Sequence, residues 1–468
     1  MHDDTGDLLR HTADLAIEHL ATIAERPVHA TATADELRAV LGGPLNDEPR
    51  DARTVVDDLA RAAAPGLVAS AGPRYFGFVV GGTLPATVAA DWLTSAWDQN
   101  SGLLALSLAN GVVEETVGRW LVELFGLPEG TSCGFVTGGQ MANFTCLAAA
   151  RNHVLARAGH DVEAEGLHDA PRLRVIGGAQ RHVTIDAALR LLGIGTSIVE
   201  GVEIDDQGRM LPDALAATLA QGDPDAPTIV NLQAGNVNSG AFDPFTEICA
   251  VAHEHARNVW VHVDGAFGLW ARASAQHRAL ADGIERADSW STDAHKWLNV
   301  PYDSGLAFVR HADAHVAAMR STAAYLANAT GDDPIDPYML TPEFSRRARG
   351  FAVYAALRNL GTRGVEDLVD RTCAHARRFA TALGDAPGVE ILNDVVLNQV
   401  LVRFGDDDDH TRAVIDGVQR DGTCWLGGTT WRGQAAMRIS VSNWSTTAAD
   451  VDRSVAAILR IHTAAQGR

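Results

Sequence analysis

The amino-acid sequence predicts an α/β protein with a mostly parallel sheet, followed by a smaller α+β domain. From about residue 110, helix-like stretches alternate with short apolar runs rich in β-branched residues. That alternation is typical of helices covering both faces of a parallel sheet. A polar stretch at 330–349 precedes a second, shorter α+β segment. We therefore expect an N-terminal helical arm over 1–75, a large domain over 76–345 and a small C-terminal domain over 346–468.

Each expected element rests on a local pattern. Apolar residues at helical spacing predict the helices of the arm, and Gly42-Gly43-Pro44 separates them. The expected helices are 6–26, 51–64, 111–124, 141–157 and 351–360. The expected strands are 174–176, 228–230, 259–263 and 306–309. Because ligands bind at the carboxyl ends of parallel strands, residues that directly follow these strands are candidates for a site.

Composition narrows the class of function. The chain has 468 residues, 46% of them hydrophobic, and a formal net charge of −21, which argues against nucleic acid or an anionic membrane as partner and favours a small polar substrate. The acidic run Asp406 to Asp409 is interpreted as a solvated loop. Five cysteines without metal-ligand spacing predict free thiols and no metal site. With no apolar run near the roughly 18 residues of a membrane span, we expect a cytoplasmic protein.

One residue type is almost absent. Of the 38 lysines and arginines, only Lys296 is a lysine. Arginine can replace lysine wherever a solvated positive charge suffices, but it stays protonated and cannot supply a nucleophilic amine. Lys296 is therefore a candidate for covalent chemistry, although drift in a biased composition would also leave a single lysine.

The surroundings of Lys296 favour chemistry. Asp264 ends the expected strand 259–263, where a carboxylate can pair with a protonated pyridine nitrogen, although aspartate also caps turns. His295-Lys296-Trp297 follows 32 residues after Asp264. The segment 137–143, with Gly138-Gly139, opens a helix whose N-terminus can bind phosphate. His182 follows another strand and is either a ring contact or a structural histidine.

Together these motifs resemble those of the group II pyridoxal-5′-phosphate (PLP) dependent decarboxylases, which act on aromatic amino acids, glutamate, histidine or tyrosine. The resemblance covers about residues 70–460. It rests on five segments: 73–78 (PRYFGF), 137–143 (TGGQMAN), 235–243 (GNVNSGAFD), 262–267 (HVDGAF) and 293–297 (DAHKW). It implies the aspartate-aminotransferase fold (fold type I), PLP as cofactor and an obligate homodimer with sites at the subunit boundary.

The resemblance also implies roles for individual residues. Lys296 would form a Schiff base with the cofactor, Asp264 would pair with its ring nitrogen, and His182 and Ala266 would contact the ring. Arg438 matches an arginine that meets a substrate carboxylate. The phosphate would be bound by Gly139, Gln140 and His295. The substrate pocket, part of which would belong to the partner subunit, would be lined by Phe78, Val79, Val80, Trp97 and Asn100. These mostly apolar residues suggest an apolar or aromatic substrate.

Decarboxylation further requires a proton donor for Cα, which in this family is a tyrosine on a loop. Tyr338 is the best match and Tyr325 the alternative, while ordinary packing is the other explanation for either residue. Rival reactions remain: a carbon–carbon lyase or aldolase acting on a β-hydroxy amino acid, a transaminase, and a catalytically silent PLP-binding scaffold. Against these alternatives, the expected function is decarboxylation of an L-amino acid to its amine and carbon dioxide.

Overall fold

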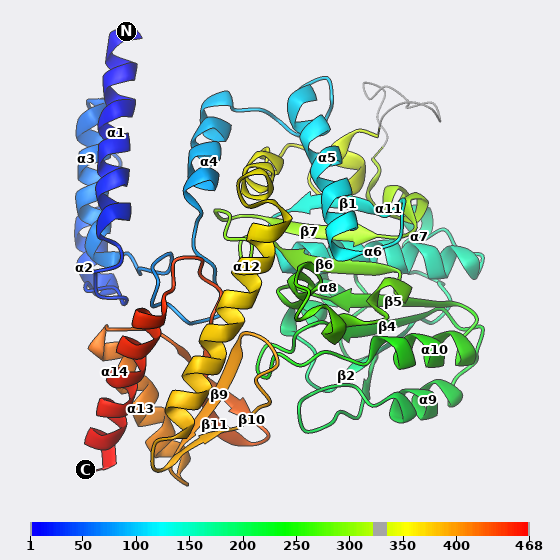
Figure 1. Ribbon diagram of the computed structural model, residues 1–468. Helices are drawn as coiled ribbons and strands as arrows, with labels where there is room; N and C mark the ends of the chain where they lie inside the picture. The colour runs from blue at the N-terminus through cyan, green and yellow to red at the C-terminus, as the bar shows by residue number, and fades with distance from the viewer. Residues whose placement is uncertain (1, 322–334, 467–468) are drawn as a thin grey trace.

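The computed structural model describes residues 2–321 and 335–466. A seven-stranded sheet forms its centre, in the order β1-β7-β6-β5-β4-β2-β3 (Figure 1). The strands are β1 Ser132–Val136, β2 Arg174–Gly178, β3 Val199–Val202, β4 Thr228–Gln233, β5 Val259–Asp264, β6 Ser289–Asp293 and β7 Gly305–Val309. Only β7 runs antiparallel to its neighbours, β1 and β6. The mostly parallel sheet predicted from the sequence is thus confirmed.

Helices cover both faces of this sheet. One layer is centred on α6 (Gly139–Arg157), which packs against α8 (Val183–Leu191) and α11 (Ala312–Met319). The other layer joins α5 (Leu108–Phe125), α9 (Pro212–Ala220), α10 (Phe245–His255) and the first part of α12 (Gly350–Gly384) in one apolar core. Because both faces are buried, every residue of β4, β5, β6 and β7 is buried as well.

A second, four-stranded antiparallel sheet lies in the C-terminal part, in the order β10-β11-β9-β8. Its strands are β8 Val389–Ile391, β9 Gln399–Phe404, β10 Gly427–Trp431 and β11 Gln434–Ser440, and α13 (Asp408–Asp421) and α14 (Ala448–Gln466) accompany it. The long α12 links the two sheets and is broken at Gly361, whose φ of 61° lies in the left-handed region. The two sheets fall on either side of residue 346, the expected domain boundary.

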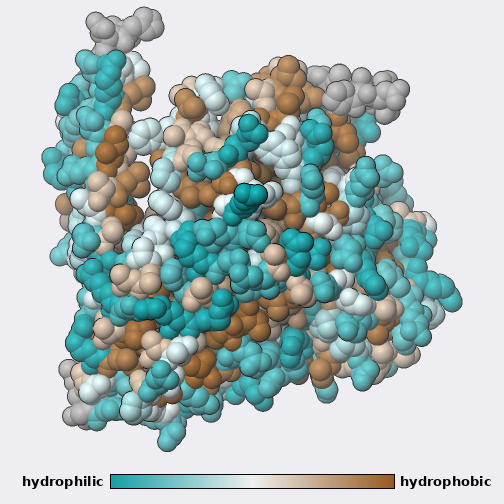
Figure 2. Space-filling model, in the orientation of Figure 1, coloured by the Kyte–Doolittle hydropathy of each residue, from teal (hydrophilic) through white to brown (hydrophobic). Residues whose placement is uncertain are grey.

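The N-terminal helices α1 (His2–Thr22), α2 (Ala34–Leu41) and α3 (Ala52–Ala63) stand apart from the body at the left of Figure 1. Neither α2 nor α3 has a buried residue. Figure 2 shows hydrophobic side chains along the arm, on the side that faces the body, and Leu9, Ile17 and Leu59 are each more than half exposed. After the arm the chain turns inward, and Phe76 packs against Phe379 in the core of the second sheet.

The expected strands and helices all occur, but among the strands of the large sheet β1, β3 and β6 were not predicted. The residues of β6, Ser-Trp-Ser-Thr-Asp, are mostly polar, so no β-branched run marks the strand. They are nevertheless buried, because their hydroxyl groups find partners inside the protein: Ser289 Oγ accepts from Trp260, and Ser291 Oγ donates to Asn143. No helix within the described ranges is long and apolar enough to span a membrane.

Candidate active site

The expected site residues converge at one edge of the large sheet. Strands β5 and β6 are parallel and pair Asp264 with Ser291, so Asp264 and the residues after β6 emerge at the same edge. Helix α6 begins there too: an added Cβ at Gly139, its first residue, would lie 2.7 Å from Oδ2 of Asp293. The loop after β6 carries Lys296. The topology therefore brings three of the predicted motifs together.

Lys296 forms an ion pair with Asp293. Its Nζ lies 3.0 Å from Oδ2 of Asp293, and its side chain is 19% exposed. The segment before α4 (Pro85–Trp97) packs on the same turn, since a Cβ at Gly81 would lie 1.8 Å from the carbonyl oxygen of Lys296. The amine is thus held in place yet remains accessible at the strand edge.

The N-terminus of α6 presents backbone N–H groups that no side chain caps. No side chain caps Gly138, the N-cap residue, so the first-turn N–H groups are free for an anion. His295 closes one side: Cε1 of its ring would lie 3.2 Å from a Cβ on Gly138. Its Nδ1 accepts from the backbone N–H of Ser304, which leaves Nε2 facing Asp293 at 3.4 Å. Burial lowers the pKa of His295. Gln140, by contrast, is exposed on the first turn.

Asp264 is a buried carboxylate with unused bonding capacity. It is 6% exposed, Oδ2 accepts from Nδ2 of Asn143 at 3.1 Å, and Oδ1 accepts from the backbone N–H of Ala266 at 3.1 Å. It forms no ion pair with any side chain in the described ranges. Because buried charges are normally paired, this carboxylate suits a cationic ring N–H from a ligand.

His182 lies in the same electrostatic neighbourhood. It caps α8, and its Nδ1 faces the hydroxyl group of Thr184 at 2.8 Å. Burial lowers its pKa; Asp264 and Asp293 act in the opposite direction, and Lys296 and Arg438 reinforce the lowering. This shift favours the neutral form of the histidine, and the groups that act on it are predicted site residues together with Asp293.

Arg438, on β11, brings the second sheet into the site. Its Nη1 donates to the carbonyl of Val237 at 3.3 Å, and it forms no ion pair with a carboxylate of the described residues. Burial lowers its pKa. A guanidinium group without a carboxylate partner is suited to bind an anionic substrate group.

The predicted substrate-mouth residues divide into two groups. Phe78 and Val79 lie three and two residues before Gly81, next to the Lys296 turn, and both have left-handed φ values, 54° and 58°. Such φ values are strained for these residue types, which is typical of functional segments. Phe78 stacks on Trp425 with ring centroids 5.4 Å apart. Trp97 instead packs edge-on against Phe351.

Of the two tyrosine candidates, the structure describes Tyr338 alone, and it lies apart from Lys296 in the single chain. Tyr338 is 3% exposed, and its ring packs against Phe344. Its hydroxyl group donates to the carbonyl of Ser321 at 3.4 Å. These contacts belong to a separate small cluster, so the structure does not bring Tyr338 to Lys296 within one chain. Tyr325 lies outside the described residues.

Asn143 and His262 were quoted in the motifs but not recognised as site residues. Both are fully buried, and Oδ1 of Asn143 lies 3.0 Å from Nε2 of His262. Their positions in the phosphate-loop and HVDGAF segments were the only available signal, because a buried hydrogen-bond network leaves no periodic pattern in a sequence.

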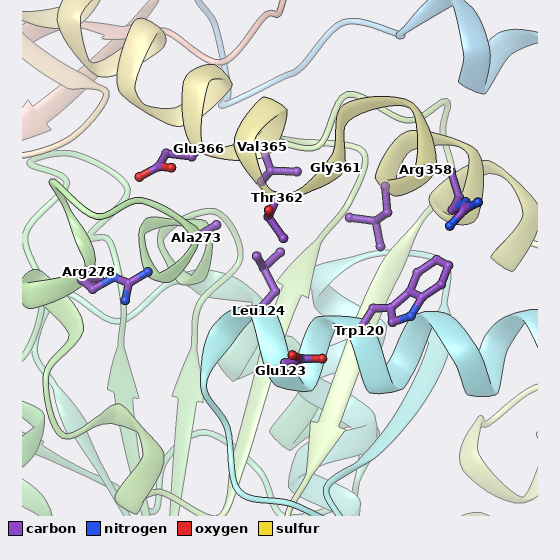
Figure 3. A pocket seen from close by; sticks show the side chains of 11 residues that line it. Trp120, Glu123, Leu124, Ala273, Arg278, Arg358, Gly361, Thr362, Val365 and Glu366 are labelled. Carbon is purple, nitrogen blue, oxygen red and sulfur yellow. The ribbon is translucent and has the colours of Figure 1, made fainter.

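A separate hollow of about 550 Å³ lies between α5, α12 and the segment that carries Ala273 and Arg278 (Figure 3). Trp120 and Arg358 form one end of it, with the guanidinium group 5.9 Å from the ring centroid. The lining residues include none of the predicted site residues. The hollow is therefore separate from the site around Lys296.

The fold and this edge of the sheet define a PLP-dependent enzyme. PLP needs a primary amine, an anionic partner for its ring nitrogen and an anion site for its phosphate. Lys296, Asp264 and the uncapped start of α6 supply these three groups. Cβ atoms on Gly138 and Gly139 would come within 3.2 Å of the His295 ring and 2.7 Å of Asp293.

Comparisons with known proteins agree. Residues 35–404 match the pyridoxal-dependent decarboxylase conserved domain. The aromatic-L-amino-acid decarboxylase of Bacillus atrophaeus is 28% identical over 84% of this chain and 80% of its own length. Tryptophan decarboxylase 1 of Oryza sativa is also 28% identical, over 94% of this chain and 90% of its own. The structure of Oryza sativa TDC with PLP and tryptamine superimposes with a TM-score of 0.91 at 23% identity, covering 99% and 98% of the two chains.

The chain therefore belongs to the pyridoxal-dependent decarboxylase family. Its fold is the PLP-dependent fold type I predicted from the sequence, its cofactor is PLP, and its reaction is decarboxylation of an amino acid. The lyase and transaminase alternatives are thereby disfavoured. Acidic amino acid decarboxylase GADL1 of Mus musculus, 31% identical over 68% of this chain and 58% of its own length, is among the relatives, so the substrate side chain is a separate question.

Proposed function

We propose that this protein decarboxylates an L-amino acid with an apolar or aromatic side chain, using PLP held as a Schiff base on Lys296. The observation that carries the proposal is that Lys296 and Asp264 lie at the same edge of the sheet, and that Asp264 has no ion-pair partner among the described residues. When bound, PLP supplies an electron sink for the electron pair left on Cα as carbon dioxide leaves.

The chain's own residues supply the remaining chemistry. Asp264 accepts the ring N–H and keeps that nitrogen protonated. The first turn of α6, which begins at Gly139, and His295 would hold the phosphate. His182 would contact the cofactor ring. The guanidinium group of Arg438 binds a carboxylate of the substrate and orients it.

The substrate class is inferred from the segment beside Lys296. Tyr75, Trp425 and Phe78 form a continuous aromatic stack, with centroid distances of 5.0 and 5.4 Å. Phe78 is 63% exposed at its end. An aromatic ring of a substrate would extend this stack and bury apolar area. Aromatic, tryptophan and tyrosine decarboxylases among the relatives are consistent with this class.

We further propose a cytoplasmic homodimer. The arm exposes apolar side chains that a single chain does not cover, and Trp97 is 49% exposed on α4. A partner would cover both surfaces and would bring Trp97 and Asn100 toward its own pocket. The five free thiols support a reducing compartment.

The test is a screen of the purified enzyme with PLP against the common amino acids, with carbon dioxide and amine both measured. We expect release from aromatic amino acids and almost none from glutamate or aspartate. Lys296→Arg keeps the charge and should lose the borohydride-reducible cofactor band and most turnover. Undiminished turnover in that variant would contradict the role of Lys296, and a preference for acidic substrates would contradict the substrate class.

A further inference from the structure

The side chain of Asn143 lies at the centre of a buried network. It projects from α6 toward β5 and β6 and is fully buried. Its Nδ2 donates to Oδ2 of Asp264 and to Oγ1 of Thr184, both at 3.1 Å. Its Oδ1 lies 2.5 Å from Oγ of Ser291 and 3.0 Å from Nε2 of His262. All four hydrogen-bonding positions of the amide are therefore used.

Asp264 fixes the orientation of this amide. A carboxylate can only accept, so the amide nitrogen must face it, and the amide oxygen must face His262. His262 then donates from Nε2. Its Nδ1 then accepts from Oγ of Ser289 at 2.9 Å, because a neutral ring that donates from Nε2 has no proton on Nδ1. Burial lowers the pKa of His262 to about 4, which agrees with a neutral ring.

The same logic extends to His182. Thr184 Oγ1 accepts from Asn143, so its hydrogen is free to point at Nδ1 of His182, 2.8 Å away. The backbone N–H of Thr184 also points at this nitrogen, at 3.3 Å. With two donors aimed at Nδ1, the proton of a neutral His182 must reside on Nε2.

We propose that Asn143 is a positioning residue that stabilises Asp264 as a carboxylate and, through Thr184, holds His182 as the neutral Nε2–H tautomer. The inference rests on the proposed function, because Asn143 would act through Asp264 and His182, whose roles belong to that function. Through this network α6 positions both Asp264 and His182. A shift of the helix would therefore displace both side chains together.

The charges around His182 do not account for its tautomer. The groups that act on it come from three places: Asp264 from β5, Lys296 and Asp293 from the end of β6 and the loop after it, and Arg438 from β11. They change the balance between the charged and neutral ring. They do not aim a donor at Nδ1, whereas Thr184 does.

The test uses the full chain with histidine labelled with ¹⁵N, with and without PLP, and follows the tautomer and titration of His182 by NMR. Asn143→Asp removes the donor to Thr184 and gives its hydroxyl group a competing acceptor. We expect the titration of His182 and the acid limb of kcat/KM to move to higher pH, with kcat/KM lower by about 10- to 100-fold, as for outer-shell partners of metal-site histidines.

Thr184→Val replaces the hydroxyl group by a methyl group and adds no charge, and it should shift the titration of His182 in the same direction. Thr184→Ser keeps the hydroxyl group and should behave as wild type. Asn258→Asp is the matched control, because Asn258 is 6% exposed at the opposite end of β5 and donates to the carbonyl of Val154. It should leave His182 unchanged.

The outcomes separate the two proposals. A proton on Nδ1 of His182 in the wild-type protein, or an unchanged His182 in both Asn143→Asp and Thr184→Val, would overturn the role of Asn143 while decarboxylation remained intact. Absence of carbon dioxide release from wild type would instead overturn the proposed function, with the tautomer measurement still readable.

Discussion

Asp264 illustrates how one side chain links burial to chemistry. Its carboxylate lacks a cationic partner among the described residues and is stabilised only by two neutral N–H donors. Such a group is costly to bury in the absence of a ligand. We expect Asp264→Asn to retain much of the fold and to bind PLP, because the neutral amide removes the unpaired charge.

The same variant should lose most of its turnover, since a neutral amide cannot keep the ring nitrogen protonated. Absorbance of the bound cofactor, together with amine release, measures both effects. Asp288→Asn serves as control: Asp288, 7% exposed, lies just before β6 and accepts from the backbone N–H of Val261, away from Lys296. Near-normal turnover of Asp264→Asn would remove Asp264 from the mechanism.

Tyr338, the predicted proton donor, is not brought to Lys296 within a single chain. Its hydroxyl group already donates to Ser321, and the ring is packed. We therefore expect Tyr338→Phe to leave the ratio of amine to aldehyde unchanged, at a cost of about 1 kcal/mol in the free energy of unfolding.

Tyr325→Phe is the matched variant. If Tyr325 delivers the proton to Cα, its loss removes a general acid typically worth about 10² to 10⁴-fold, and dioxygen then competes to give aldehyde, ammonia and peroxide. Chromatography of the products under air and under nitrogen compares the two variants. Aldehyde from Tyr338→Phe alone would reverse the assignment.

At the scale of elements, the segment before α4 depends on close contact with the Lys296 turn. A Cβ at Gly81 would lie 1.8 Å from the carbonyl of Lys296, whereas Gly201 in β3 has nothing within 4 Å of an added Cβ. Gly81→Ala should therefore lower the free energy of unfolding by about 1 to 3 kcal/mol, the usual cost of overpacking. It should also displace Phe78 and reduce turnover. Gly201→Ala is the control, and urea denaturation measures the free energy of unfolding of both variants. Equal stabilities would contradict the contact at Gly81.

Helix α11 contributes a pH dependence of stability. His315 joins it to β1 and to the segment before α12: Nδ1 faces Ser132, and Nε2 lies 3.0 Å from the carbonyl of Leu340. Burial lowers the pKa of His315 from its usual 6.5 to about 4. Between these values the unfolded chain binds a proton that the folded chain does not, so stability falls as pH falls through this window.

We expect His315 to account for a loss of about 2 kcal/mol between pH 7.5 and pH 5. His315→Gln should flatten that part of the curve, whereas His168→Gln, at a side chain that is 92% exposed, should not. Urea denaturation at both pH values measures it. An unchanged slope in His315→Gln would show that this histidine is not the source.

The elements also show what the sequence could and could not specify. β-Branched runs marked β2, β4, β5 and β7, because such residues suit a strand buried on both faces. The polar β6 was missed, since its pairing depends on partners distant in the chain. For the site, the lone lysine and the strand-end Asp264 were readable. The network through Asn143 was not, because it joins α6, β5, β6 and α8 through side-chain contacts that only the tertiary fold creates.

For the whole molecule, the arm predicts the oligomeric state. Leu9 and Leu59, on α1 and α3, are 61% and 59% exposed, and a second copy would bury them. The double variant Leu9→Asp/Leu59→Asp should weaken the dimer and lower activity together, as measured by light scattering and amine release. Leu191→Asp, on α8 and 56% exposed, is the control. A wild-type protein that is fully active as a monomer would contradict the arrangement.

The lone lysine also gives this chain an unusual peptide map. A protease that cuts only after lysine has a single cleavage site in the sequence, after Lys296, and should divide the denatured chain into one large and one small fragment. Borohydride reduction of the enzyme with its cofactor would turn that lysine into a secondary amine, which such a protease no longer accepts. The fraction of chain left uncut on a denaturing gel would then report how much of a preparation carries its cofactor.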